Sequence, residues 1–333
     1  MNKETQAILH ATMVAARLHK RLAKQESLFD NGRVNVFEAA FHLGVPLLFR
    51  PLDQLLGAFL SDPAPGVLVT TKRPLSVQRF TVAHELGHQQ LGHTASLDQE
   101  GILARSPYWG SRQDLQELEA NAFAAAFLMP RSLMAQQCKR HGWIGLQLQS
   151  PIPVYQLSLR LGASYEATCW ALHRYDFLTL SQAKKLAAVS PKEIKSGLLG
   201  GYRPETFWGD VWLLDEHDRE TKVSGSRSDL FIFRLPEHSG GGYLWNFDEL
   251  AKTEFRVVRD ERESVDDGIG SNSVRRITAE SEDRQVGLLR LTEARPWQPA
   301  EAIHEFVLAY DLSGPEQPGE SIYERRRLLE IGA

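Results

Sequence analysis

The segment His84-Glu85-Leu86-Gly87-His88 places two imidazoles and one carboxylate within five residues. The mostly apolar residues 79–83 before it predict a helix that runs through, so the histidines lie at i and i+4 on one face. That spacing lets two imidazole nitrogens bind one tetrahedral zinc ion. Glu85 then lies beside the metal, where a carboxylate can take a proton from water.

The alternative is a solvated helix with two surface histidines. Residues 79–83 argue against it, because they predict a buried helix, and a buried histidine pair without a partner costs free energy. We therefore prefer the metal site. His93 follows His88 by five positions, about 140° around a regular helix, so we expect it to support a ligand or the fold, with metal ligation as the lesser alternative.

A second helix is predicted over residues 114–129, where several alanines permit close approach to the first helix. One carboxylate from it would complete three protein ligands and leave a fourth position open, as in catalytic zinc sites. We expect Glu119 to point inward, because it begins the alanine-rich part and is flanked by Leu118 and Phe123. Glu117 is about 200° away on a helix and is expected to be solvated. An ordinary exposed glutamate remains the alternative for either position.

Residues 79–88, 91–93 and 117–130 resemble the ImmA/IrrE family of bacterial and phage metallopeptidases. The resemblance covers about residues 5–185 and implies a mainly helical, zincin-like domain of the gluzincin kind. It implies zinc ligands His84, His88 and Glu119, with Glu85 as the base. Family members typically cleave helix-turn-helix repressors or antitoxins in stress responses or mobile elements, which suggests the substrate class.

The composition is that of an ordinary soluble protein: 333 residues, 42% hydrophobic and 24% charged, with a formal net charge of -4. We expect two or three domains, and the charge gives no general attraction to nucleic acid or membranes. Two cysteines, Cys138 and Cys169, form no disulfide framework. With no signal peptide or apolar run of membrane-spanning length, we expect a cytoplasmic protein.

The first half is expected to hold a small sheet before the catalytic helix, whose edge strand can hold an extended substrate. We expect that helix to end near Gly92 and residues 94–112 to form a mobile loop over the site. Residues 157–167 have helix-turn-helix cadence, but the second helix is poor in basic residues, so packing against the peptidase core is favoured over DNA binding. The predicted helices are 5–24 and 36–43, and the predicted strands 45–49, 57–60 and 66–70.

Beyond a Pro/Gly-rich stretch the pattern changes to short alternating runs, which predict an immunoglobulin-like β-sandwich. The predicted strands are 211–214, 230–235, 255–259, 274–279, 286–291 and 306–310. The fold class is thus α+β, a mainly helical metallopeptidase domain with a small sheet followed by a sandwich. The predicted organisation is a first domain 1–189, a linker 190–206, a sandwich 207–312 and a solvated tail 313–333.

Three loops of the sandwich resemble the binding loops of the chagasin family, immunoglobulin-like inhibitors of papain-type cysteine peptidases. Residues 288–297 are the most similar segment, whereas the first loop lacks the family's Asn-Pro-Thr-Thr-Gly pattern and the middle loop its final glycine pair. Trp297 is either a binding anchor or a packed residue. The candidate binding-loop residues are Gly241, Gly242, Tyr243, Trp245, Gly268, Gly270, Arg295, Pro296 and Trp297.

The sequence therefore predicts a zinc endopeptidase that acts on a protein, with the sandwich recognising a protein or restraining the peptidase. The alternative is a non-catalytic binding protein whose sandwich binds or inhibits a peptidase.

Overall fold

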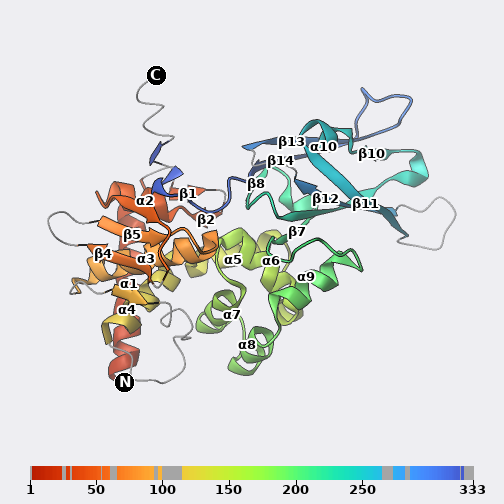
Figure 1. The fold of residues 1–333 in the computed structure, drawn as a ribbon. Helices are drawn as coiled ribbons and strands as arrows, with labels where there is room; N and C mark the ends of the chain where they lie inside the picture. Colours follow the sequence, from red (N-terminus) through yellow and green to blue (C-terminus); the bar gives the residue numbers. More distant parts are fainter. Residues whose placement is uncertain are drawn as a thin grey trace. The chain divides into compact units, whose positions relative to one another are not determined.

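The structure, a computed structural model, describes residues 2–24, 28–30, 32–53, 55–60, 66–93, 97–99, 115–264, 273–281, 286–322 and 324–325. The chain forms two compact units (Figure 1). Unit 1 comprises Met1–Ser150, Arg160–Ala188 and Pro315–Ala333, and unit 2 comprises Pro151–Leu159 and Val189–Gly314. Among the described residues, no helix combines the length and the apolar character that a bilayer-spanning segment requires.

Unit 1 contains a five-stranded mixed sheet in the order β15-β3-β5-β4-β6. β3 pairs parallel to β5, and β4 pairs antiparallel to β5. In β3 the side chains alternate, so that Leu47 and Phe49 are buried while Leu48 and Arg50 are exposed, as expected for a sheet with one covered face. The strands are β3 (Leu47–Arg50), β4 (Leu55–Leu60), β5 (Gly66–Thr70), β6 (Leu97–Gln99) and β15 (Gly319–Glu320).

Three helices build the core beside this sheet. α3 (Leu75–Leu91) packs on β4 and β5, and α4 (Leu115–Leu128) packs between α3 and α1 (Lys3–Leu22). α1 presents the buried stripe Ala7, Ala11 and Ala15, one turn apart, so its backbone can approach α4 closely. The other elements of unit 1 are β1 (Phe29–Asp30), β2 (Arg33–Val34), α2 (Val36–His42), α5 (Arg131–Arg140), η3 (Gly145–Gln149), α7 (Tyr165–Arg174) and α8 (Leu180–Ala187).

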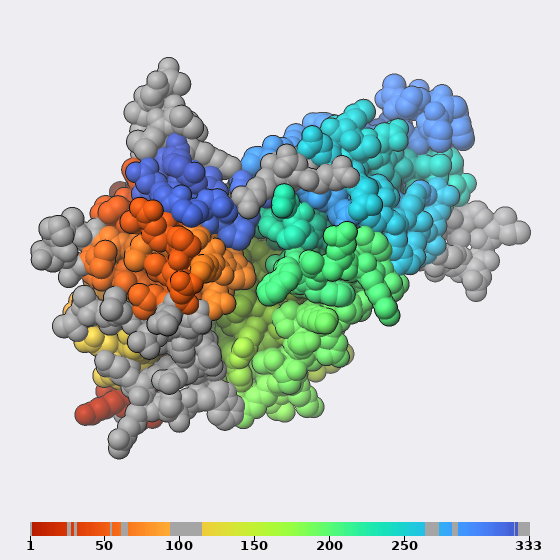
Figure 2. Space-filling model, in the orientation of Figure 1, coloured from red at the N-terminus to blue at the C-terminus, as the bar shows by residue number. Residues whose placement is uncertain are grey.

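The C-terminal segment belongs to unit 1, so the predicted solvated tail is wrong for its described part. β15 pairs antiparallel with β3, and Ser321 is fully buried. The side chain of Gln78 on α3 accepts from the Glu316 amide at 2.8 Å and donates to its carbonyl at 3.4 Å. Figure 2 shows the blue C-terminal atoms lying on the orange atoms of unit 1. An unpaired sheet edge and a buried amide explain why this segment does not stay in solvent.

Unit 2 is a sandwich of two four-stranded sheets, β10-β13-β14-β8 and β11-β12-β9-β7. Aromatic rings from the two sheets meet edge to face in its core: Phe233 meets Phe306 at 6.2 Å, and Phe255 meets Tyr310 at 5.3 Å. The strands are β7 (Val211–Leu214), β8 (Thr221–Ser224), β9 (Leu230–Glu237), β10 (Leu244–Asn246), β11 (Phe255–Ser264), β12 (Ser273–Ser281), β13 (Val286–Ala294) and β14 (His304–Asp311). The short elements are η4 (Glu216–Asp218), η5 (Ser239–Gly241) and α10 (Asp248–Lys252). The predicted fold class is confirmed.

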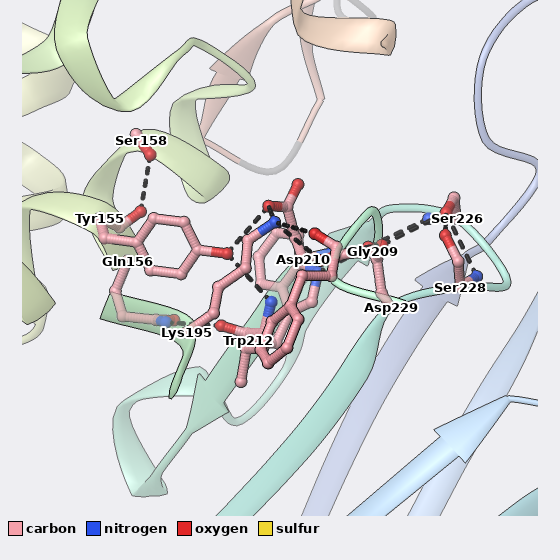
Figure 3. Close-up of polar contacts among 12 residues, drawn as sticks. Tyr155, Gln156, Ser158, Lys195, Gly209, Asp210, Trp212, Ser226, Ser228 and Asp229 are labelled. Atoms are coloured by element: carbon pink, nitrogen blue, oxygen red, sulfur yellow. Dashed lines mark hydrogen bonds and ion pairs between the residues drawn. The ribbon is translucent and has the colours of Figure 1, made fainter. Parts of the chain in front are cut away.

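Helix α6 (Pro151–Leu161) contributes its first residues to unit 2 through the edge strand β7 (Figure 3). Gln156 donates to Val211 O at 2.8 Å and accepts from Leu213 N at 2.9 Å. Tyr155 Oη donates to Asp210 at 2.8 Å and accepts from Val211 N at 3.0 Å. These side chains satisfy backbone groups that an edge strand would otherwise leave unpaired.

The predicted linker 190–206 is instead helical over most of its length. α9 (Pro191–Leu199) starts at an N-cap Ser190 whose side chain accepts from Glu193 N, and it buries Ile194, Leu198 and Leu199. Lys195 donates to Gly209 O at 2.8 Å and lies 3.1 Å from the Asp210 carboxylate (Figure 3). The glycines and prolines that suggested a linker act as helix boundaries here, with Pro191 at the start and Gly200 in the left-handed conformation at the end.

Candidate metal centre and active site

Helix α3 carries the histidine pair in the interior of unit 1. Its apolar face predicts burial, and His84 and His88 are only 1% and 2% exposed, while Glu85 is 1% exposed. Arg79, one turn and a half before His84, donates to Val34 O at 2.6 Å and Gly162 O at 3.1 Å, which fixes the start of the helix. A solvated helix with two surface histidines is thereby excluded.

The two imidazoles and one carboxylate converge with the spacing that zinc requires. The Nε2 atoms of His84 and His88 lie 3.0 Å apart. Oxygens of Glu117 lie 3.3 Å from His84 Nε2 and 3.4 Å from His88 Nε2. Donors about 2.0 Å from a tetrahedral ion lie roughly 3.3 Å from one another. His84, His88 and Glu117 therefore fit a metal ion held by three protein ligands, and their spacing suits zinc.

Glu119, which the sequence favoured as the third ligand, faces another direction. Its Oε2 lies 3.1 Å from Nε2 of His93, and its Oε1 lies 3.3 Å from Nδ1 of His10. Glu117 and Glu119 are two positions apart on α4, so their side chains point about 200° apart around the helix axis. Only one of the two can therefore face α3. That residue is Glu117, which the sequence placed in solvent, and the expectation for Glu119 is corrected.

Two further side chains hold the imidazoles in place. Asn121 Oδ1 lies 3.1 Å from His84 Nδ1, and His93 Nδ1 lies 3.0 Å from His88 Nδ1. Such partners fix the orientation of ligating imidazoles. His93 reaches this position because α3 ends at Gly92, whose φ of 70° reverses the chain so that His93 N donates to His88 O. The supporting position expected for His93 agrees with this geometry.

The sequence-based prediction did not include Asn121 among the site residues. Asn121 lies at i+4 from Glu117, so both side chains project from one face of α4 towards the histidine pair. This Glu-x-x-x-Asn spacing was the available signal.

Two glycines permit the close approach of the elements that carry these groups. A Cβ at Gly57 on β4 would lie 2.3 Å from Thr81 Cγ2, 2.9 Å from Leu68 O and 3.3 Å from Glu85 Oε1. A Cβ at Gly87 on α3 would lie 3.0 Å from Phe123 and 3.3 Å from the Ala120 backbone. The predicted close approach of the alanine-rich helix is thus observed, and Glu85 lies directly against β4.

Strand β4 has a neighbour on each side within the described residues. β5 pairs with one edge, and β6 pairs with the other through Leu55, Gly57 and Ala58. Among the described strands, β6 therefore forms one edge of this sheet, and β15 forms the other. The loop predicted over residues 94–112 lies outside the described residues except for β6.

Two of the three candidate loops of unit 2 contact each other. The Arg295 guanidinium lies 4.6 Å from the Tyr243 ring, and its Nε donates to Gly241 O at 3.2 Å. Trp297 is 69% exposed and lies next to Gly242. Pro296, between Arg295 and Trp297 in the chain, is exposed. Gly268 and Gly270 lie outside the described residues.

Trp245, also expected in a binding loop, is a core residue of the sandwich. It is buried, and its indole Nε1 donates to Pro236 O at 2.7 Å. The short strand β10 explains the difference, because pairing with β13 turns this side chain inward.

Comparison with known proteins agrees with the geometry of unit 1. Residues 40–173 match the family described as Peptidase_M78, the IrrE N-terminal-like domain. These residues of the N-terminal half are similar to an IrrE-like domain. Two curated relatives, both named radiation response metalloprotease IrrE, match over 134 residues, which are 39% of this chain. The protein of Deinococcus radiodurans is 35% identical, with 37% of its length covered, and that of Deinococcus deserti is 33% identical, with 43% covered. The chain thus matches less than half of the length of either relative.

About a third of the chain is similar, with low TM-scores, to solved structures of cysteine protease inhibitors. The inhibitor EhICP2 of Entamoeba histolytica is 20% identical, with 31% of this chain and 96% of that chain covered and a TM-score of 0.28. PbICP-C, solved in complex with falcipain-2, is 12% identical, with 33% of this chain and 96% of that chain covered and a TM-score of 0.22. The inhibitor resemblance of unit 2 stays a prediction.

Proposed function

We propose that the IrrE-like domain is a zinc-dependent endopeptidase. The observation that carries the proposal is the convergence of His84 Nε2, His88 Nε2 and the Glu117 carboxylate within 3.4 Å of one another, beside the buried Glu85. This donor set and the expected open position are those of catalytic zinc sites in peptidases. The metalloprotease names of the two relatives support the same reaction class.

The protein's own residues would divide the chemistry between them. Bound zinc would polarise the peptide carbonyl and make a water molecule more acidic. Glu85 follows the first ligand in the chain and would serve as the base that takes a proton from water and as the acid that gives it to the leaving amine. Asn121 and His93 keep the two imidazoles oriented.

We further propose that the substrate is a protein of the helix-turn-helix repressor or antitoxin class, and that the outcome is regulatory proteolysis. Unit 2 would recognise a protein through the paired loops around Tyr243 and Arg295 or restrain the peptidase. The exposed Trp297 beside Gly242 supports a recognition role, because exposed tryptophans commonly anchor interfaces.

The same loops favour a second candidate, a non-catalytic protein whose unit 2 binds or inhibits a peptidase. The two candidates differ in the effect of Glu85→Gln. A peptidase loses cleavage in this variant while zinc content is unchanged. A binding protein has no turnover to lose, and the full chain would instead inhibit papain in a dose-dependent manner that Trp297→Ala weakens.

The test uses zinc-loaded full chain and the repressors and antitoxins encoded beside its gene, with cleavage followed by mass spectrometry. Glu85→Gln is the inactive control, and elemental analysis measures zinc in both proteins. Equal cleavage by wild type and Glu85→Gln would refute the role of Glu85. Cleavage of no neighbour, together with inhibition of papain, would favour the binding protein.

A further inference from the structure

A second group of metal-binding side chains lies in unit 2, at one end of the sandwich. His238 follows β9, Glu293 lies near the end of β13, and His304 begins β14. Glu293 and His304 are direct partners across β13 and β14, whereas β9 belongs to the other sheet. The three residues therefore join the two sheets at this end.

One ligand atom from each of the three residues lies within 4.8 Å of the other two. Glu293 Oε2 lies 2.8 Å from His304 Nδ1 and 3.2 Å from His238 Nδ1. Glu293 Oε1 accepts from the His238 backbone amide at 2.6 Å, which holds the carboxylate in place. Three donors around one tetrahedral ion lie roughly 3.3 Å apart. One carboxylate oxygen and two imidazole nitrogens thus lie close enough together to share one ion.

The charge of Glu293 also calls for a cation. Its side chain is 0% exposed, and among the described residues its partners are the two histidines and an amide. A second carboxylate nearby, Glu237, is equally buried but is neutralised by Arg262 Nε at 2.9 Å. A buried carboxylate is costly unless positive charge lies beside it. A divalent cation at this point would supply such a charge.

The donor types select the kind of metal. Two imidazoles with one carboxylate suit Zn²⁺ and the neighbouring transition metals, whereas Mg²⁺ and Ca²⁺ prefer oxygen ligands alone. The side chains of His238 and His304 are 40% and 39% exposed, so an ion can enter from solvent.

We propose that His238, Glu293 and His304 form a transition-metal site that binds Zn²⁺, in addition to the site in unit 1. His238 precedes η5 and the Gly241–Tyr243 loop, and His304 follows the turn that contains Trp297. Bound Zn²⁺ would tie the bases of both loops together and order the surface that they form. The inference concerns a different unit and does not depend on the proposed peptidase activity.

The test counts Zn²⁺ in the full chain by elemental analysis after loading and gel filtration. We expect about two ions per chain in wild type. His304→Asn should bind one ion, and the double variant His84→Asn/His88→Asn should also bind one. The variant with all three substitutions should bind none. One ion in wild type that His304→Asn retains would overturn the proposal and leave the group as a hydrogen-bonded cluster.

A matched pair of variants covers the case in which a substitution disturbs folding. Glu293→Gln should remove the second ion, while Glu237→Gln, a substitution at an equally buried glutamate, should retain it. Titration of the His84→Asn/His88→Asn chain with Co²⁺, which gives visible absorption bands, should show one bound ion at tetrahedral intensity. Hydrogen exchange in residues 238–246 and 293–304 should slow on Zn²⁺ addition in wild type and not in His304→Asn. Equal exchange with and without Zn²⁺ would contradict the ordering of the loops.

Discussion

The carboxylate of Glu119 lies 3.1 Å from Nε2 of His93, on the far side of that imidazole from His88. His93 contacts the candidate ligand His88 through the two Nδ1 atoms. Among the described residues, Glu119 therefore contacts no candidate ligand directly and supports His88 through His93. Glu117, two residues earlier on the same helix, contacts the Nε2 atoms of both His84 and His88. Two neighbouring glutamates of similar exposure thus have separate roles, and the difference can be measured.

Glu117→Gln should weaken zinc binding roughly 100-fold or more, because loss of an outer partner of a ligand alone costs about 10–100-fold. Glu119→Gln is the matched control and should weaken binding by about tenfold at most, since Glu119 acts through His93. Competition with a chromophoric chelator measures both affinities. The reverse order of the two variants would reassign the third ligand to Glu119.

Gly57→Ala should destabilise unit 1, because its Cβ would meet Thr81 Cγ2 at 2.3 Å and Leu68 O at 2.9 Å. Overpacking of this kind costs about 1–3 kcal/mol. The control is Gly197→Ala in α9, where a Cβ meets nothing within 4 Å, and a gain of about 0.5–1 kcal/mol is expected for alanine in a helix. Urea unfolding followed by circular dichroism measures both, and an unchanged midpoint for Gly57→Ala would contradict the described packing of β4 on α3.

The parts of the site that the sequence predicted are those with a strong local pattern. The i,i+4 spacing of His84 and His88 places both imidazoles on one face of a helix, and Gly92 marks the end of that helix. The choice between Glu117 and Glu119 depended on the rotation of α4 about its axis. That rotation cannot be read from a helix buried on almost every side, with alanines and phenylalanines all around it.

Long-range contacts explain the remaining differences. The strand β15 and the edge contacts of Gln156 on β7 form between segments far apart in the chain, and their own sequences carry no alternating pattern. The Pro/Gly-rich residues 190–206 suggested a linker, but Ser190 and Pro191 are also a helix start signal.

Removal of residues 315–333 should destabilise unit 1, because β15 leaves β3 and Gln78 loses two hydrogen bonds to Glu316. Gln78 is fully buried on α3, and a buried polar group without its partner costs about 1–3 kcal/mol. Removal of residues 326–333 keeps every described contact and is the control. Differential scanning calorimetry compares the two truncations, and equal unfolding temperatures would show that the C-terminal segment contributes nothing to unit 1.

We expect the stability of unit 2 to depend on pH through the buried carboxyl group of Asp229. Burial raises the pKa of Asp229 to about 6, and the nearby Asp210 carboxylate adds to the shift. Asp229 also accepts hydrogen bonds from Asp210 N at 2.9 Å and from Trp212 Nε1 at 3.0 Å, and these bonds lower its pKa and partly offset the effect of burial (Figure 3). Because the folded-state pKa exceeds the unfolded value, the folded protein binds the proton more tightly. This group's contribution to stability is therefore present at low pH and is lost as pH rises through about 6.

Asp229→Asn removes the titrating group and, with it, this dependence on pH. The variant should be less stable than wild type at every pH, because an amide cannot accept at both positions. The difference in unfolding free energy between wild type and variant should be larger at pH 5 than at pH 7 by about 1 kcal/mol, as a pKa difference of two units implies. Urea titrations of unit 2, followed by tryptophan fluorescence at both pH values, provide the comparison. A difference that is constant between pH 5 and pH 7 would mean that Asp229 keeps an ordinary pKa in the folded protein, and that its hydrogen bonds from Asp210 and Trp212 outweigh the effect of burial.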